Sequence, residues 1–445
     1  MADNKAPPAS GGVFCCPIAR KRRVGSGRFS VGLTRRFGAV LLRSPFLLNP
    51  TPSLARPFRV LPIIVLAQFA CTSLWFAGNA VLPEMLREGQ LRGLTAGAAV
   101  SAVQLGVIVG TLLASLLRVA DLLPPARLFV LCAVVGSGLN AGLLLPGATP
   151  QLVLVLRFGT GLFLAGIYPV GMKIAADYFE NGLGRALGYL VGALVLGTAL
   201  PHLLRLLAGG WTWRAVVLAT SGLALAGGLL LWARVPDGPF RRPAARLDAA
   251  VLGTVLRHRG FRQAALGYFG HMWELYTFWA FVPLLLATHA HLHPGLPAYG
   301  PGWAFGLIAA GAPACVLGGY LARRWGSLPT ARLALAISGA CCLLSPWLLA
   351  LPRPAFVGAM LVWGMAVVAD SPQFSTLVAQ RAPAGTTGTA LTLVTCAGFA
   401  LTVVSLQAFG AVQHWIAAPY LFWVLVPGPL LGLLATRARP EVTVR

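Results

Sequence analysis

The chain has 445 residues, of which 57% are hydrophobic and 10% are charged, and its mean hydropathy is +0.76. A soluble core could not bury this share of apolar side chains, so the composition excludes a soluble globular protein and indicates a membrane protein with many spans. The net charge of +24 would favour nucleic acid as a partner of a soluble protein, but here the basic residues lie in loops and in the N-terminal segment. We therefore expect no nucleic-acid partner.

Residues 1–59 carry eleven Lys or Arg residues and a single acid, Asp3. We interpret this segment as a basic, disordered tail. It is not typical of a signal peptide, because no apolar stretch with a small-residue cleavage site follows the basic part. It could reflect a reading frame that starts too early, a tail that touches anionic lipid on the cytoplasmic face, or an organelle-targeting segment. We favour the first two.

Twelve apolar segments follow, each long enough to cross a bilayer, because about 20 helical residues at about 1.5 Å each span about 30 Å of hydrocarbon. We expect spans at residues 60–82, 96–117, 128–146, 152–178, 186–207, 214–233, 264–288, 303–322, 331–351, 354–379, 387–409 and 414–436. The last two spans form one uncharged run. Gln407, Gly410 and Gln413 are expected to mark the turn between them.

Basic residues are distributed unevenly between the two sides of the membrane that this count defines. One side holds 29 of the 35 Lys and Arg residues and the other holds five. The positive-inside rule then predicts that both termini are cytoplasmic, which requires an even number of spans. The polar loop from Arg234 to Arg262 separates six spans from six, and we expect a short amphipathic helix near residues 247–257 to lie on the inner leaflet.

The predicted fold class is an all-α polytopic membrane protein with twelve transmembrane helices in two pseudo-symmetric six-helix halves. The predicted parts are the tail (1–59), the N-terminal half (60–233), a cytoplasmic basic linker (234–263), the C-terminal half (264–436) and a cytoplasmic tail (437–445).

The two halves are related by an internal repeat. A shift of 200 residues aligns Phe69, Ala80, Pro83 and Leu86 with Phe269, Ala280, Pro283 and Leu286. A shift of 203 aligns Gly161 and Pro169 with Gly364 and Pro372. Repeats of this kind are one of the architectures of secondary transporters, whose substrate site lies between the halves near the bilayer midplane.

The chain resembles the major facilitator superfamily, which has twelve spans, a six-plus-six repeat and a basic central loop. The family's loop signature between spans 2 and 3 is degraded here to LLRVADLLPPARLF, in which Asp121 and Arg127 stand where the family has its acid and its distal base. The second copy, GGYLARRWGSLPTARL, keeps Gly319, Arg324 and Gly326, with Arg323 in place of the acid. The resemblance implies that these residues belong to a gating loop.

Further motifs bear on the type of transporter. Span 4 has Arg157 followed four residues later by Gly161, which is similar to the family pattern. Pro201 does not directly follow Gly197, so the glycine-proline motif of drug/proton antiporters is incomplete. The phrases GYFGHMWELY and VVADSPQF look like those of a prokaryotic subgroup of the family, which implies a bacterial inner (plasma) membrane.

The resemblance also implies that spans 1, 4, 7 and 10 line the central cavity. The two acids deepest in the membrane, Glu274 and Asp370, lie on spans 7 and 10, and the one deep arginine, Arg157, lies on span 4. A charged side chain near the bilayer centre costs at least about 2.5 kcal/mol, so each is a candidate functional residue.

Helical spacing groups other polar and aromatic residues with these charges. The candidate substrate-binding or coupling residues are Glu274, Asp370, Arg157, His271, Gln68, Trp75, Asn79, Tyr168, Trp273 and Gln373. On span 7, His271, Glu274 and Phe278 share one face. Such groups would suit a cavity that orients a small polar or amphiphilic solute.

The favoured hypothesis is a secondary active transporter in which Glu274 and Asp370 exchange protons and Arg157 binds an anionic part of the substrate or pairs with one of these acids. Burial favours the neutral form of a carboxyl group and a nearby arginine favours the charged form, so alternation between two states can load and release a proton. His271 could relay that proton. Each group could instead be purely structural.

Uptake of a small organic anion is slightly favoured over proton-driven efflux of a cationic or amphiphilic compound. A transporter without proton coupling and a non-transporting receptor or assembly protein stay open. An enzyme is not expected, because Asp370 is the only deep aspartate and neither H-E-x-x-H nor G-x-S-x-G occurs. We expect a monomer in contact with the lipid bilayer, a small-molecule substrate and protons.

Two further patterns received structural interpretations. The eight cysteines form no C-x-x-C pair, and the run His289, His291, His293 has no convincing further ligand, so we expect no cofactor and no metal ion. The glycine pairs Gly106/Gly110 on span 2 and Gly188/Gly192 on span 5 permit close helix packing. The resemblance implies that these two spans form the contact between the halves.

Overall fold

The apolar segments of the chain form long helices in the computed structural model, which describes residues 57–88, 91, 93–117, 119, 123–179, 183–207, 212–240, 249–295 and 297–437. Twelve helical segments in this part of the chain are long and apolar enough to cross a membrane. They cover residues 59–87, 96–116, 125–144, 150–178, 185–207, 213–234, 259–292, 301–325, 327–349, 353–381, 387–412 and 418–435. The twelve predicted spans are therefore confirmed, with ends that differ by a few residues.

The helices of the first half are α1 (Pro57–Thr72), α2 (Leu74–Arg87), α3 (Ala96–Leu116), α5 (Pro125–Ala141), η1 (Gly142–Leu144), α6 (Pro150–Leu164), α7 (Tyr168–Tyr178), α8 (Leu183–Leu207) and α9 (Trp213–Arg234). The loop helix is α10 (Ala249–Arg257). The second half contains α11 (Arg259–Leu292), α12 (Pro301–Ala309), α13 (Gly311–Trp325), α14 (Ser327–Leu349), α15 (Arg353–Ala369), α16 (Ser371–Arg381), α17 (Thr387–Val412), η2 (Ala418–Leu425) and α18 (Pro427–Ala435).

Several spans are interrupted partway across. Span 4 is divided into α6 and α7, and span 10 into α15 and α16. Pro169 and Pro372 lie in the first turn of the second segment in each case. Proline has no backbone N–H, so it is readily accommodated in the first turn of a helix, where that donor would be unpaired anyway. The two prolines that the sequence repeat aligns therefore occupy equivalent positions just after equivalent breaks.

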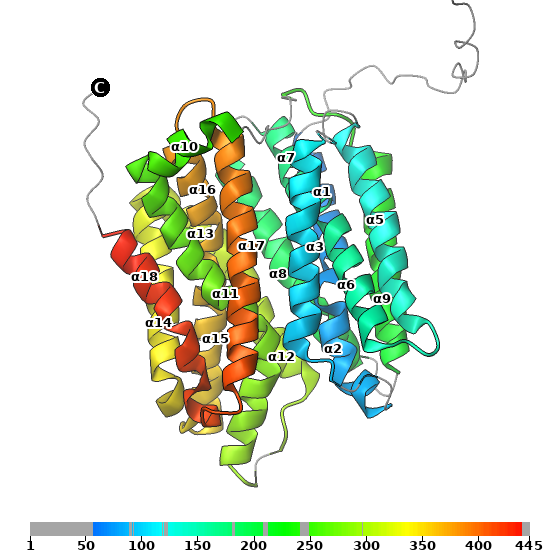
Figure 1. The fold of residues 1–445 in the computed structure, drawn as a ribbon, viewed down its shortest axis with the longest axis vertical. Coiled ribbons are helices and arrows are strands. Elements are labelled where there is room, and N and C mark those ends of the chain that lie inside the picture. The colour runs from blue at the N-terminus through cyan, green and yellow to red at the C-terminus, as the bar shows by residue number, and fades with distance from the viewer. Residues whose placement is uncertain are drawn as a thin grey trace, which may run out of the picture. The chain divides into compact units, whose positions relative to one another are not determined.

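The helices from Leu54–Arg445 belong to one unit. Within it, α3 packs on α6, α5 on α9, and α1 on α8 and α9, whereas α11 packs on α17 and α18, and α15 on α13 and α14. Figure 1 shows α1, α5, α6 and α9 on one side and α11, α14, α15 and α18 on the other, with α3 and α17 side by side between them. These contacts confirm the two six-helix halves.

Equivalent glycines in the two halves make equivalent close contacts. A Cβ atom at Gly161 of α6 would lie 2.0 Å from the carbonyl oxygen of Val103 on α3. A Cβ atom at Gly364 of α15 would lie 2.1 Å from the carbonyl oxygen of Leu307 on α12. Only glycine allows the backbones to approach this closely. The alignment of Gly161 with Gly364 thus reflects the same helix contact made twice.

The halves meet along two helix pairs. On one side α8 packs against α12 and α13, and on the other α3 packs against α17. Gly188 and Gly192 support the first pair, because their built Cβ atoms would lie 3.5 Å and 3.2 Å from the carbonyl oxygens of Cys315 and Ala312. In the second pair the Gln407 amide donates a hydrogen bond to Ser101 Oγ at 2.8 Å.

Gly106 and Gly110 make their close contact within one half, although span 2 also takes part in the contact between halves as expected. Their built Cβ atoms would lie 2.0 Å and 2.3 Å from the carbonyl oxygens of Phe158 and Leu162, both on α6 of the same half. These glycines therefore hold α3 against α6. The contact of α3 with α17 uses another face, which includes Ser101.

Gly106→Ala should lower the stability of the purified protein by at least about 2 kcal/mol, because the methyl group would overlap the Phe158 carbonyl and separate α3 from α6. Gly222→Ala is the matched control, since a Cβ atom there meets nothing within 4 Å. Its stability should stay the same or rise slightly, because alanine is the better helix former. Thermal unfolding in detergent compares them, and equal midpoints would contradict the assignment.

Local structure departs from expectation at two places. The helix α17 continues through Gln407 and Gly410 to Val412, so only Gln413 belongs to the predicted turn. Helix α11 extends to Leu292, beyond the expected end of its span at residue 288, so His289 and His293 lie one turn apart with their ring centroids 4.2 Å apart. The short helix expected near residues 247–257 is confirmed as α10.

Candidate functional site

Three titratable side chains are gathered inside the second half. His271 and Glu274 lie on α11, and Asp370 lies at the break between α15 and α16. Each is 0% exposed. His271 Nδ1 lies 2.8 Å from Asp370 Oδ1, which makes an ion pair when the imidazole is protonated. We call these three residues, with Ser338 and Cys342, the carboxylate cluster.

Helix α14 supplies the remaining members of this cluster. The Ser338 hydroxyl donates to Glu274 Oε2 at 2.8 Å, and the Cys342 thiol donates to the same oxygen at 3.5 Å. The other oxygen, Oε1, is buried with no partner among the described residues, as are Asp370 Oδ2 and His271 Nε2. Buried polar atoms usually have hydrogen-bond partners, so these three atoms can accept or bind something further.

The break in span 10 places Asp370 where it can face α11. Asp370 is the last residue before α16, and its carbonyl oxygen accepts hydrogen bonds from the amides of Gln373 (3.0 Å) and Phe374 (2.9 Å). A break in a buried helix leaves some backbone N–H and C=O groups outside the regular helical hydrogen bonding. Ion sites in transporters use such breaks. The break in span 10 thus carries a buried acid.

The cluster points into the second half rather than toward the first. Glu274 faces α14 and His271 faces Asp370, and the Phe278 ring packs at a tilt against Trp363 of α15, with the ring centroids 4.8 Å apart. The predicted common face of His271, Glu274 and Phe278 is thus the face that packs on the neighbouring helices α14 to α16.

An aromatic cluster occupies the contact between halves, and the sequence reasoning identified only one of its members. Trp75 and Phe76 of α2 lie against Tyr276, Trp279 and Phe399 of the second half. The ring centroids are 5.6 Å apart for Trp75 and Tyr276, and 6.2 Å apart for Phe76 and Trp279. All five rings are buried. The spacing of Tyr276 and Trp279, three residues apart on α11, could have indicated this second face.

Arg157 binds backbone rather than a carboxylate in this conformation. Its Nη1 donates to the carbonyl oxygen of Leu74 (3.0 Å) and to Asn140 Oδ1 (3.2 Å), and its Nη2 donates to the carbonyl oxygen of Trp75. The side chain is 1% exposed, and Nε has no partner among the described residues. Arg157 therefore anchors the start of α2 next to the aromatic cluster, and the structure does not bring it to Glu274 or Asp370.

Other polar candidates of the first half also have unused atoms. Gln68 is fully buried and neither atom of its amide has a partner among the described residues. The same holds for Trp75 Nε1 and Asn79 Oδ1. Tyr168 is partly buried at the first position of α7. Gln68, Trp75 and Asn79 thus offer donors and acceptors along span 1 that no atom in the described part of the chain satisfies.

Two candidates of the second half lie elsewhere. Trp273 Nε1 donates to the carbonyl oxygen of Val424 at 2.9 Å, so this ring packs toward η2 and α18, away from the aromatic cluster. Gln373 is buried on α16, and its Nε2 would lie 3.8 Å from a Cβ atom built at Gly318 of α13.

The structure describes four of the five expected gating-loop residues. Asp121 lies outside the described residues, and Arg127 is exposed at the start of α5. Gly319 is half-buried on α13 and Arg324 is exposed at its end. Gly326 has φ 87°, a left-handed conformation that favours glycine and lets α13 turn directly into α14.

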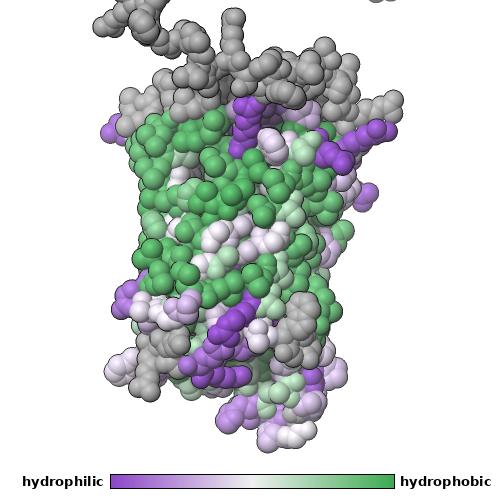
Figure 2. Space-filling view, turned by 90° about the vertical axis from the view of Figure 1, so that its right-hand side faces the viewer, coloured by the Kyte–Doolittle hydropathy of each residue, from purple (hydrophilic) through white to green (hydrophobic). Residues whose placement is uncertain are grey.

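The arrangement defines a class of protein. Figure 2 shows one face that is mostly apolar across its middle, with hydrophilic residues gathered at both ends, as a bilayer-crossing protein requires. Two similar six-helix halves, broken helices and buried titratable groups together are typical of secondary transporters. The molecule is a multi-pass membrane protein with this fold.

The chain belongs to the Major Facilitator Superfamily, whose sequence profile matches residues 64–406. Members of this family are membrane transporters rather than enzymes. Among solved structures, the chain is similar to the crystal structure of the human organic anion transporter MFSD10 (TETRAN), with a TM-score of 0.66 and 16% identity over 86% of this chain and 99% of that one. No curated protein matches the sequence. The resemblance seen in the sequence is thereby confirmed.

Proposed function

We propose that this protein is a secondary active transporter that moves a small solute by alternating access and couples it to protons. The observation that carries the proposal is the carboxylate cluster, in which three titratable side chains are fully buried within membrane-crossing segments. No Lys or Arg side chain of the described residues forms an ion pair with either acid. Two acids without a permanent positive partner need a proton or another cation to stay buried.

Substrate contact would come from the first half. The unsatisfied polar atoms of Gln68, Trp75 and Asn79, together with Tyr168, lie on spans 1 and 4. The buried Nε–H of Arg157 is a donor that no atom of the described residues accepts from. These groups suit a small organic anion with an apolar part that stacks on aromatic rings. That MFSD10 transports organic anions is consistent with this choice.

The same site could serve proton-driven efflux of a cationic or amphiphilic compound, because the aromatic cluster would bind either. We further propose that the protein is a monomer in a bacterial inner membrane with both termini in the cytoplasm. The positive-inside distribution of Lys and Arg supports this orientation. A non-transporting receptor with this fold would bind a ligand without flux.

The test begins with thermal unfolding of the detergent-purified protein against small anions, sugars, amino acids and hydrophobic cations at about pH 5.5 and 7.5. A ligand at 100 times its Kd adds about 2.7 kcal/mol of apparent stability. A hit is then loaded into proteoliposomes with and without a pH gradient. We expect gradient-dependent accumulation of an anion. Binding without flux would favour the receptor, and flux indifferent to the gradient would refute proton coupling.

A further inference from the structure

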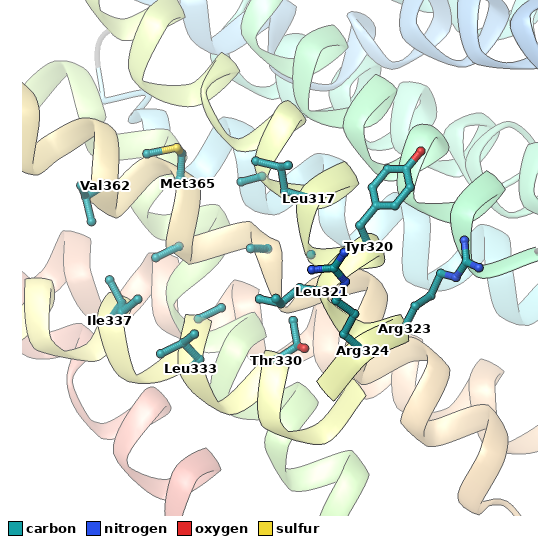
Figure 3. A pocket seen from close by; sticks show the side chains of 15 residues that line it. Leu317, Tyr320, Leu321, Arg323, Arg324, Thr330, Leu333, Ile337, Val362 and Met365 are labelled. Atoms are coloured by element: carbon teal, nitrogen blue, oxygen red, sulfur yellow. The ribbon is translucent and has the colours of Figure 1, made fainter. Parts of the chain in front are cut away.

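A groove on the second half has none of the carboxylate-cluster residues in its lining, although its lining includes Arg324 of the gating loop. It runs between α13 and α14 with α15 as its floor, and its volume is about 790 Å³ (Figure 3). Pockets of about 300–1,000 Å³ hold ligands the size of a typical drug molecule. Its apolar walls include Leu317, Leu333, Ile337, Val362 and Met365.

The groove opens toward the hydrocarbon of the bilayer. Leu317, Leu333 and Val362 are 64%, 46% and 45% exposed, although all three lie well within membrane-crossing helices. Side chains exposed at this depth face lipid tails rather than water. An occupant of the groove must therefore present an apolar chain.

One end of the groove is positively charged. Arg323 and Arg324 are the charged residues of its lining, and both belong to the last turn of α13. Neither forms an ion pair with the described residues. Figure 3 shows Arg324 beside Leu321, with the apolar side chains extending beyond it. Arg323 stands where the family signature has an acid, so no carboxylate in this position neutralises the pair.

The charged end is at headgroup depth on a definite side of the membrane. Helix α11 starts at the central loop, and α12 with α13 return to that same side. The central loop is on the basic, cytoplasmic side by the positive-inside rule. The cytoplasmic leaflet carries anionic lipids, and Arg side chains near a helix end reach toward the headgroups.

We propose that this groove is a binding site for an anionic glycerophospholipid of the cytoplasmic leaflet. One acyl chain lies along Leu317, Leu333 and Val362, and the headgroup phosphate is held by Arg323 and Arg324. Guanidinium groups bind phosphate in a bidentate manner, which gives preference over a zwitterionic headgroup. The proposal does not depend on the transported substrate.

Native mass spectrometry of the full chain, released from detergent with equal amounts of phosphatidylglycerol and phosphatidylcholine of the same acyl chains, tests this site. We expect retention of one phosphatidylglycerol. An arginine near an anionic surface contributes about fivefold in affinity, so Arg323→Gln with Arg324→Gln should weaken binding about thirty-fold. Leu317→Trp, which fills the groove without removing charge, should also displace the lipid.

The control is Arg234→Gln with Arg257→Gln, which removes two exposed arginines near the same membrane face but away from the groove. It should retain phosphatidylglycerol like the wild type. Equal loss in both double variants would mean that binding is nonspecific and would overturn the proposal. Retention of phosphatidylglycerol by the variant with both Arg323→Gln and Arg324→Gln would overturn it as well. So would a disulfide-linked dimer of a Leu333→Cys variant, because the groove would then face a second copy of the chain.

Discussion

Asp370→Asn should reduce substrate accumulation driven by a pH gradient to the level of empty vesicles while leaving the protein folded. Asparagine has nearly the same shape but can neither bind nor release a proton, and the contact of 2.8 Å with His271 then loses its ionic character. Glu274→Gln should have the same effect on accumulation, because glutamine cannot exchange a proton. It should also stay folded, because it keeps an acceptor for the Ser338 hydroxyl. Solute uptake into proteoliposomes measures this directly.

The matched control is Glu88→Gln, since Glu88 is an exposed acid at the end of α2 that pairs with Arg214 at 2.9 Å. It should accumulate substrate like the wild type. If Asp370→Asn accumulates substrate normally, the carboxylate cluster does not couple protons. If instead both cluster variants unfold early and keep the wild-type pH dependence, the cluster is a structural element of the second half.

Arg157→Lys should destabilise the protein by about 3 kcal/mol or more, because an ammonium group cannot reach Leu74, Trp75 and Asn140 at once. Two carbonyl oxygens at the start of α2 would then lose their buried donors. Thermal unfolding in detergent measures this loss of stability. Gly78→Ala should cause a smaller loss, since its Cβ atom would lie 2.9 Å from Arg157 Nε.

Arg205→Lys is the control for this variant. Arg205 also donates to a backbone carbonyl, that of Ala80 at 2.9 Å, and pairs with Glu84, but its side chain is 23% exposed. Water can replace those partners, so the loss should stay below about 1 kcal/mol. An equal effect of both lysine substitutions would show that Arg157 does not anchor α2 in the way its contacts indicate.

The sequence by itself determined the number of spans and the duplication. A bilayer of fixed thickness requires runs of about 20 apolar residues, so each span is readable from hydropathy alone. The cost of burying charge identified Glu274, Asp370 and Arg157 before any neighbour was known.

Only the tertiary structure decided which neighbours these residues meet. Helical periodicity groups His271 with Glu274, but it does not say that their face meets α14 to α16, while Tyr276 and Trp279 meet the other half. Likewise Gly106 and Gly110 hold α6 rather than the second half. In a membrane, lipid and protein interior are equally apolar, so hydropathy does not distinguish the lipid-facing side of a helix from its protein-facing side. Which helices meet is decided by close backbone packing and by hydrogen bonds between segments distant in sequence.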